Sequence, residues 1–93
     1  MLLGGENVRE YLTELRKHKG MTQQDVATAV GVSRQYYNLI ENGERQRRMD
    51  ILLAAKIATT FEVSIMEIVD FERQYNLQAK EDKEREERRV APT

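Results

Sequence analysis

Two short segments with helical apolar spacing, residues 22–30 and 34–42, are joined by only three residues. Two helices with so short a link must cross steeply, which requires a small residue where they meet and a glycine where the backbone turns. Ala27 meets the first requirement and Gly31 the second. Thr22 and Asp25 are spaced nearly as in a capping box at the start of the first helix, and Ser33 is a residue type that caps the start of the second. This stretch therefore predicts a pair of short helices that fold against each other as one unit.

Three further helices are predicted from apolar spacing and capping residues. Residues 7–19 carry apolar side chains at i, i+3, i+4 and i+7, with an asparagine cap at the start and a glycine just after the end. Residues 50–61 carry a wide apolar stripe, which indicates a mostly buried helix. Ser64 and Glu67 form a capping box that begins a fifth helix, expected to run through Val69. No segment alternates like a strand, so the predicted fold class is all-α, a compact five-helix domain.

The composition changes after Phe71, where apolar residues become rare and charged residues dominate. We therefore expect a folded domain over residues 1–71, with the paired short helices at residues 22–43, and a charged C-terminal extension over residues 72–93. The extension has no heptad pattern for a coiled coil, and we expect it to be solvated and partly helical. A chain of 93 residues provides one small core, so we expect no second, ligand-sensing domain.

The formal net charge of −1 conceals one basic and one acidic region. Residues 34–48 contain four arginines against two acidic residues, whereas residues 49–71 contain one lysine, Lys56, against four acidic residues. The four acidic residues are Asp50, Glu62, Glu67 and Asp70. A basic patch fits a nucleic-acid partner, although a basic balance over the whole chain would favour such a partner more strongly.

Several classes of function find no support in the sequence. The chain has no cysteine, which excludes a disulfide framework and a cysteine-based metal site. His18 stands alone near a helix end, and no nucleophile–base pair, glycine-rich phosphate loop or carboxylate cluster emerges. We therefore expect no enzyme, no metal and no cofactor. The N-terminus does not look like a signal peptide and no stretch reaches the roughly 20 apolar residues of a membrane helix, so we expect a cytoplasmic location.

A specific set of residues at fixed spacing surrounds the paired short helices. They are Leu15, Arg16, Gly20, Thr22, Gln23, Val26, Ala27, Gly31, Val32, Ser33, Tyr37, Ile40, Glu41 and Gly43, followed by Ile57, Ala58, Val63 and Ser64. This pattern resembles the lambda-repressor-like, or Xre-type, helix-turn-helix family, over residues 8–69. Two features depart from the family pattern, since no proline follows Gly43 closely and the loop after it is two residues longer. The resemblance implies a protein that binds double-stranded DNA and regulates transcription.

The resemblance implies that the second of the paired helices lies in the major groove. With Tyr37 and Ile40 turned inward, a rotation of about 100° per residue turns other side chains outward or onto the flank at the helix start. These are Arg34, Gln35, Asn38 and Leu39. Arginine can bond guanine bidentately, glutamine can bond adenine, and leucine suits the thymine methyl group. We expect base contacts from these four residues, with ordinary surface residues as the alternative.

The predicted DNA-binding set has further members that would contact phosphates or support those contacts. They are Gln23, Ser33, Tyr36, Asn42, Arg45, Arg47 and Arg48. The three loop arginines should neutralise phosphates, unless they form a plain solvated loop. The resemblance implies phosphate contacts for Gln23 and Asn42, and Asn42 could also be a simple helix cap. It further implies an ion pair between Arg16 and Glu41 as part of the scaffold.

A single unit of this kind makes few base contacts, so we expect a homodimer on a partly palindromic operator. The fifth helix carries more apolar residues than a short surface helix needs. We expect the dimer interface to contain Ile65, Met66, Val69, Phe71 and Tyr75. The alternative is that the charged extension folds back and covers them.

A second interpretation is an interaction module of the same fold, either an antitoxin that binds a toxin or a coactivator-like bridge to a polymerase. The acidic region at residues 49–71 keeps this interpretation open. Arg34 and Gln35 favour the DNA-binding regulator, because a bridging protein has no need of them on the exposed side of a helix. Phage regulators, restriction–modification controllers and antitoxins all use this domain, and the sequence does not separate them, nor repression from activation.

Overall fold

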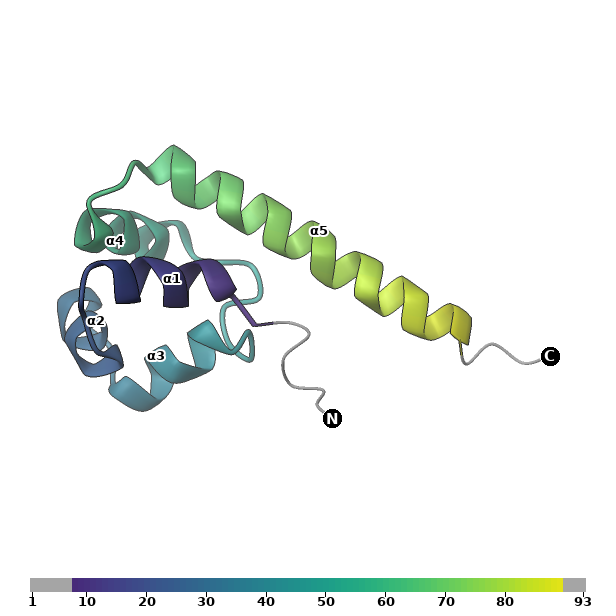
Figure 1. Cartoon of the computed structure of the whole chain (residues 1–93), viewed down its shortest axis with the longest axis horizontal. Helices are drawn as coiled ribbons and strands as arrows, with labels where there is room; N and C mark the ends of the chain where they lie inside the picture. Colours follow the sequence, from purple (N-terminus) through teal and green to yellow (C-terminus); the bar gives the residue numbers. More distant parts are fainter. Residues whose placement is uncertain (1–7, 90–93) are drawn as a thin grey trace.

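The computed structural model describes residues 8–89, and over residues 82–89 it describes the backbone alone. The described residues form five helices and no strand, which confirms the predicted all-α fold class. In chain order the helices are α1 (Glu10–His18), α2 (Gln23–Val30), α3 (Arg34–Glu41), α4 (Ile51–Phe61) and α5 (Ile65–Arg89). Helices α1 to α4 form a compact body, and α5 packs on this body and then continues beyond it (Figure 1).

The predicted caps explain where three of the helices begin. The Thr22 hydroxyl accepts a hydrogen bond from the Asp25 N–H at 3.0 Å, and the Asp25 carboxylate accepts one from the Thr22 N–H at 2.9 Å. This reciprocal pair begins α2, and the Ser33 hydroxyl caps α3. Ser64 and Glu67 form a second reciprocal pair, with both hydrogen bonds at 3.0 Å, at the start of α5.

Helix α1 begins at Glu10, later than the apolar spacing predicted. Asn7, the predicted cap, lies outside the described residues. Arg9 stands at the cap position, but its side chain does not cap the helix, and its backbone N–H donates to the Glu41 carbonyl at 2.8 Å. At the other end Gly20 follows the helix as predicted, with a φ of 69° that favours glycine.

One apolar core lies where the helices of the body meet the start of α5. Its buried members are Leu12, Val26, Ala27, Val30, Tyr37, Ile40, Leu53, Ala54, Ile57, Ala58, Phe61 and Ile68. Ile51 belongs to the apolar stripe predicted for α4 but is 70% exposed. As the first residue of α4 it lies at the edge of the body, so the buried stripe of this helix begins with Leu53.

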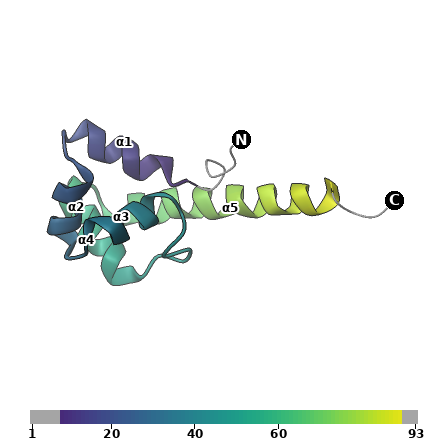
Figure 2. The ribbon, with the colours of Figure 1, turned by 90° about the horizontal axis from the view of Figure 1, so that it is seen from below.

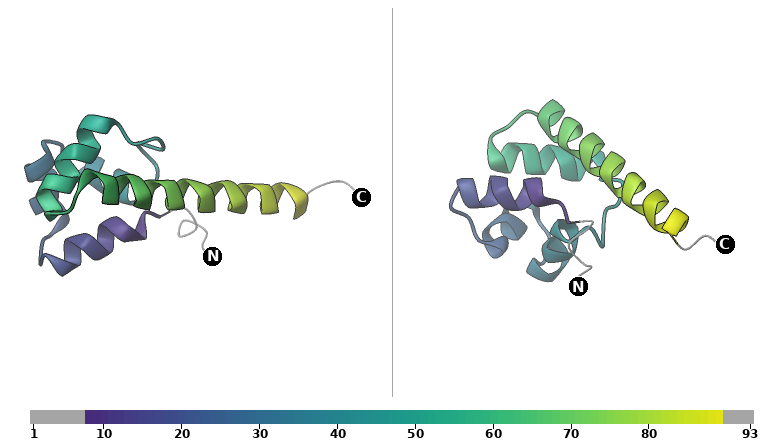
Figure 3. Two further views of the ribbon diagram at one scale, coloured as in Figure 1. Left: turned by 90° about the horizontal axis from the view of Figure 1, so that it is seen from above. Right: turned by 45° about the vertical axis from the view of Figure 1, so that its right-hand side comes forward.

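Helix α5 is longer than predicted and has no break near residue 72. Ile68 and Glu72, one turn apart, face the body and are buried, whereas Met66 and Leu77 are each 59% exposed. The helix runs on away from the body, so its described part does not fold back over its own apolar residues (Figures 2 and 3). The division into a domain and an extension stays a prediction, and residues 90–93 lie outside the described residues.

The Glu41 carboxylate at the end of α3 joins this helix to α1 and α2. It is buried and accepts hydrogen bonds from Arg16 Nε at 2.8 Å, Gln23 Nε2 at 3.0 Å and Thr13 Oγ1 at 3.1 Å. Burial favours the neutral acid, but the hydrogen bonds from Arg16 and Gln23 outweigh it and hold the pKa of Glu41 below its usual value. The ion pair that the resemblance implied is therefore present.

Replacing Glu41 with alanine should destabilise the fold by about 3 kcal/mol, because the Arg16 guanidinium loses its partner in a largely buried place. The Arg16 side chain is 14% exposed, which puts the expected loss at the lower end of the range for buried pairs. Urea denaturation at neutral pH measures the loss. Glu44→Ala is the matched control at an exposed position and should change the free energy of unfolding by less than about 0.5 kcal/mol.

The loss in free energy of unfolding caused by Glu41→Ala should become smaller as the pH falls. Because the pKa of Glu41 is lowered in the folded protein, its stabilisation is complete above the ordinary value of 4.5 and disappears as the pH falls through the folded-state pKa. The urea midpoints of the wild type and Glu41→Ala should therefore converge in acid. A difference that stayed constant down to about pH 3 would contradict a charged, buried pair.

Candidate nucleic-acid interface

The turn between α2 and α3 has the predicted geometry. Gly31 ends α2 with a φ of 82°, a left-handed value at which glycine is favoured. The Val32 N–H then donates to the Ala27 carbonyl at 2.9 Å and closes the last turn of α2. Ala27 has no exposed surface. It is the small buried residue that two closely crossing helices require. The turn therefore fixes how α3 leaves α2.

The N-terminal end of α3 presents polar side chains to solvent. Arg34 and Gln35 are its first two residues and both are exposed. Within the described part of the chain neither side chain has a hydrogen-bond partner, so their donors are available to a ligand. Ser33, directly before them, accepts a hydrogen bond from the Tyr36 N–H at 3.0 Å and serves as the helix cap.

One turn further along, the predicted contact residues are less accessible. Asn38 and Leu39 are half-buried, and Asn38 Oδ1 accepts a hydrogen bond from Asn42 Nδ2 at 2.8 Å. Asn42 ends α3 as its C-cap, with φ −81° and ψ −1°. The capping role foreseen for Asn42 is therefore present, and its exposed amide keeps a second N–H for a ligand.

Two predicted phosphate ligands already make contacts within the protein. Gln23 Nε2 donates to Glu41 at 3.0 Å, and the Tyr36 hydroxyl accepts from Gln46 Nε2 at 2.9 Å. Gln23 retains one amide N–H and Tyr36 retains its hydroxyl proton, so each can still donate one hydrogen bond. Gln46 was not among the predicted residues, and nothing in its local sequence marks it.

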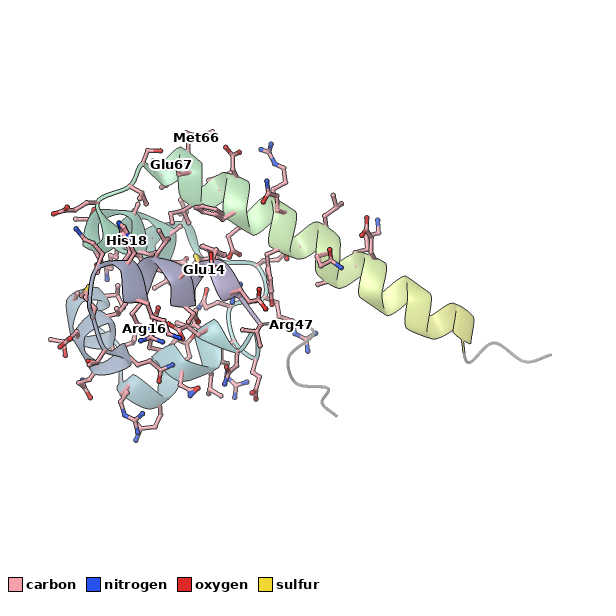
Figure 4. The ribbon with its side chains drawn as sticks, in the orientation of Figure 1. Glu14, Arg16, His18, Arg47, Met66 and Glu67 are labelled. Carbon is pink, nitrogen blue, oxygen red and sulfur yellow. The ribbon has the colours of Figure 1, made fainter. Side chains whose placement is uncertain are left out.

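Residues 42–50, here called the arginine loop, connect α3 to α4. At its centre Gln46 has a φ of 60°, a left-handed value that residues with side chains rarely adopt. The Gln46 side chain also accepts a hydrogen bond from the Asp50 N–H at 2.9 Å, which helps to hold this conformation. Around it lie the exposed arginines Arg45, Arg47 and Arg48. Figure 4 shows Arg47 at the edge of the body where α3 ends.

Arg9 was not among the predicted functional residues, and its side chain is fully buried against this loop. Its Nε and Nη2 donate to the Glu72 carboxylate at 2.7 and 3.1 Å. Its Nη1 donates to the Ile40 carbonyl at 2.8 Å and the Arg45 carbonyl at 3.2 Å, and Nη2 also donates to the Gln46 carbonyl. All five N–H groups of the guanidinium therefore have an acceptor.

Aromatic side chains of α1 and α5 surround the pair of Arg9 and Glu72, and Tyr11 contacts Glu72 directly. The Tyr11 hydroxyl donates to the Glu72 carboxylate, and the Tyr11 ring stacks on Phe71 with centroids 4.8 Å apart. Burial and the nearby carboxylate raise the pKa of Tyr11, so its hydroxyl stays protonated as the donor. The Tyr75 ring lies 4.6 Å from the guanidinium carbon of Arg9 in a cation–π contact.

The residues predicted for a dimer interface do not share one face of α5. Ile65 and Val69 line a groove between α4 and α5, whereas Phe71 and Tyr75 line a separate hollow beside the start of α1. Met66 is exposed and lies at the outer edge of the molecule in Figure 4. The five residues thus offer two patches rather than one, and the assembly itself stays a prediction.

The acidic side chains of residues 49–71 mostly have structural partners. Asp50 caps α4 by accepting from the Leu53 N–H at 3.1 Å, and Glu67 caps α5. Glu62 pairs with Lys19 Nζ at 2.6 Å, and this hydrogen bond lowers the pKa of Glu62. The acidic region is therefore not one continuous free surface.

His18 is exposed at the end of α1 (Figure 4). Over residues 8–81, whose side chains are described, no group of three or more histidine, cysteine and acidic side chains could hold a metal ion. Among the helices that the structure describes, none is long and apolar enough to cross a membrane.

Known proteins that are similar to this chain include two regulators. The first is the uncharacterized HTH-type transcriptional regulator YqaF of Bacillus subtilis (strain 168), which is 40% identical over 50 residues. That match covers 54% of this chain and 63% of the length of YqaF. The second is the clp gene regulator ClgR from Corynebacterium glutamicum, which has a crystal structure. It superimposes with a TM-score of 0.65 at 26% identity and covers 99% of this chain and 98% of that chain.

The helix-turn-helix family pattern matches residues 12–68, a range that contains α2, the glycine turn and α3. This match agrees with the residues that carried the resemblance in the sequence. The observed capping box, the left-handed Gly31 and the buried Ala27 are the local features that such a motif requires. The chain therefore belongs to the helix-turn-helix family, of the lambda-repressor-like type.

Proposed function

We propose that this protein binds double-stranded DNA sequence-specifically and regulates transcription, with α3 placed in the major groove. The observation that carries the proposal is the pair Arg34 and Gln35, exposed at the N-terminal end of a helix whose other end is anchored. An arginine can bond guanine O6 and N7, and a glutamine can bond adenine N6 and N7. Family membership and similarity to a transcriptional regulator and to a gene regulator support the same function.

Asn38 and Leu39 extend the proposed base-contacting surface by one turn. Both are half-buried, so they can contact only a base that approaches closely. Leu39 suits the methyl group of a thymine, and Asn38 suits a polar base edge. We assign the main discrimination to the first turn of α3 and a smaller share to these two residues.

Phosphate contacts on both sides of α3 would fix its position in the groove. At the start of α2, Gln23 keeps one amide N–H beside the unpaired backbone N–H groups of a helix N-terminus, which attract anions. At the other side, the arginine loop supplies its exposed guanidinium groups, and Tyr36 and Asn42 each keep one donor. We therefore propose these groups as phosphate ligands; Gln23 lies beside Glu41 at the C-terminal end of α3, where the arginine loop also starts.

We further propose that the protein acts as a homodimer on half-sites about 34 Å apart, because one unit supplies few base contacts. Met66 is the most exposed of the predicted dimer residues, and Ile65 and Val69 line the adjacent groove. Phe71 and Tyr75 each have one ring face occupied within the protomer, so each can offer at most its other face and its edges. A protein-bridging role has weaker support, since most of the acidic side chains it would use have structural partners.

Arg34→Ala and Gln35→Ala should each weaken operator binding by about 1–3 kcal/mol and relax the preference at one position per half-site. Each change removes one bidentate base contact and leaves the helix anchors intact. Selection of bound duplexes from a random pool measures the preference. Arg73→Ala, which removes an exposed arginine from α5, should select the wild-type sequence. If Arg34→Ala also selected the wild-type sequence, Arg34 would not contact a base.

Arg47→Ala should weaken binding to all duplexes alike, because a phosphate contact carries no sequence information. A plot of log affinity against log salt concentration should become shallower by about 0.9 for one lost contact. Titration of random duplex DNA over a range of potassium chloride concentrations measures this slope. Lys56→Ala, at an exposed position on α4, is the control and should leave the slope unchanged. A wild-type affinity that did not depend on salt would count against DNA binding itself.

The free protein should sediment as a dimer at high micromolar concentration, and Met66→Glu should shift it toward the monomer by placing a charge in an apolar contact. The same change should weaken operator binding, because the two half-sites are then bound independently. Leu77→Glu is the matched control, since Leu77 is equally exposed on the same helix but lies outside the proposed patch. A wild-type monomer, with operator affinity untouched by Met66→Glu, would leave the patch without a role.

A further inference from the structure

We propose that Arg9 is a positioning residue for the arginine loop and that its partner Glu72 makes the phosphate contacts of this loop depend on the docking of α5. The inference rests on the DNA-binding function proposed above and concerns the regulation of the same surface. The start of α1, the arginine loop and α5 converge at one end of the body (Figure 1), and the hydrogen bonds of Arg9 join all three.

The arginine loop is held partly by hydrogen bonds of its own and partly by Arg9. Gln46 sits at a φ of 60°, which is unfavourable for a residue with a side chain unless the surroundings compensate. Arg9 donates to the carbonyls of Arg45 and Gln46, the two residues that carry this turn. The buried guanidinium therefore adds to the contacts of the Gln46 side chain in stabilising the left-handed conformation.

The same contacts direct the loop arginines outward. With the carbonyls of Arg45 and Gln46 turned toward the interior, the side chains of the neighbouring arginines are exposed to solvent. A buried cation next to three further arginines would repel them if it were not neutralised. Glu72 supplies that neutralisation at 2.7 Å, so the loop and Arg9 can stay in contact only while Glu72 is present.

Glu72 belongs to α5, the helix that continues beyond the body. Tyr75, one turn later, covers the guanidinium, and Arg47 lies close enough to oppose the rise that burial causes in the pKa of Tyr75. A shift of α5 would thus move the partner of Arg9 and loosen the loop. Arg34 and Gln35 should be unaffected, because Arg9 binds α3 at its opposite end and, among the described residues, the loop reaches the first turn of α3 only through Tyr36.

Glu72→Gln tests the inference, since it keeps the shape of the side chain and removes its charge. The salt dependence of binding to random duplex DNA should become shallower, by about 0.9 for each phosphate contact that the loop loses. The sequence selected from a random pool should stay that of the wild type. Asp70→Asn is the matched control, because it removes one exposed carboxylate from the same helix and should leave the slope unchanged.

The slope of log affinity against log salt concentration distinguishes a loss of loop positioning from a general loss of stability. A partly unfolded protein binds with an affinity reduced by its folded fraction, and this factor leaves the salt slope as it was. Arg47→Ala is then added to both proteins. It should flatten the slope clearly in the wild type and much less in Glu72→Gln, because the loop already contributes less there.

A second variant keeps the test decisive if Glu72→Gln does not fold. Tyr11→Phe removes only the hydroxyl that donates to Glu72, and it should flatten the slope in the same direction by a smaller amount. If Arg47→Ala flattens the wild-type slope while both variants keep the wild-type slope, the positioning role of Arg9 and Glu72 is overturned and the proposed function stands. If the wild type itself shows no salt-dependent binding to duplex DNA, the proposed function fails instead.

Discussion

The buried guanidinium of Arg9 is the contact on which the arrangement of the other elements depends. A charged group taken out of water costs several kcal/mol unless it is paired and every donor is satisfied. The acceptors of Arg9 come from the end of α3, from the arginine loop and from α5, which are far apart in the sequence. The fold can bury this side chain only by bringing these three elements to the start of α1.

Arg9 also supplies hydrogen-bond donors to the carbonyls at the C-terminal end of α3. The last carbonyls of a helix have no partner within it and carry a partial negative charge, so a cation is favoured there. Arg9 donates its backbone N–H to the Glu41 carbonyl and its side chain to the Ile40 carbonyl, both at 2.8 Å. The Glu41 carboxylate then binds Arg16 and Gln23. Side chains and backbone together therefore anchor the C-terminal end of α3 to α1 and α2.

Features that depend on neighbouring residues, such as helix caps and turns, could be predicted from the sequence. Contacts between residues far apart in the sequence could not. Both capping boxes and the glycine turn depend on residues at most a few positions apart, and they are where the spacing predicted. Arg9 and Glu72 are 63 residues apart, and the charge-rich composition after Phe71 concealed that Glu72 continues the buried face of Ile68 by one turn. The exposure of Arg34 and Gln35 followed from helical spacing. Gln23 and Tyr36 form hydrogen bonds with side chains of other elements, and these contacts could not be predicted from the sequence.

The two ends of α3 therefore tolerate amino-acid substitution to different degrees. At the C-terminal end, a substitution of Glu41 strands Arg16, and a substitution of Ile40 disturbs the buried core. At the N-terminal end, Arg34 and Gln35 have no partner among the described residues, so a substitution there leaves the fold intact. A helix that contacts bases must be held to within a fraction of an ångström, and anchoring it at the far end achieves this without involving the contacting side chains. The proposed base contacts could therefore change in such a domain independently of its stability.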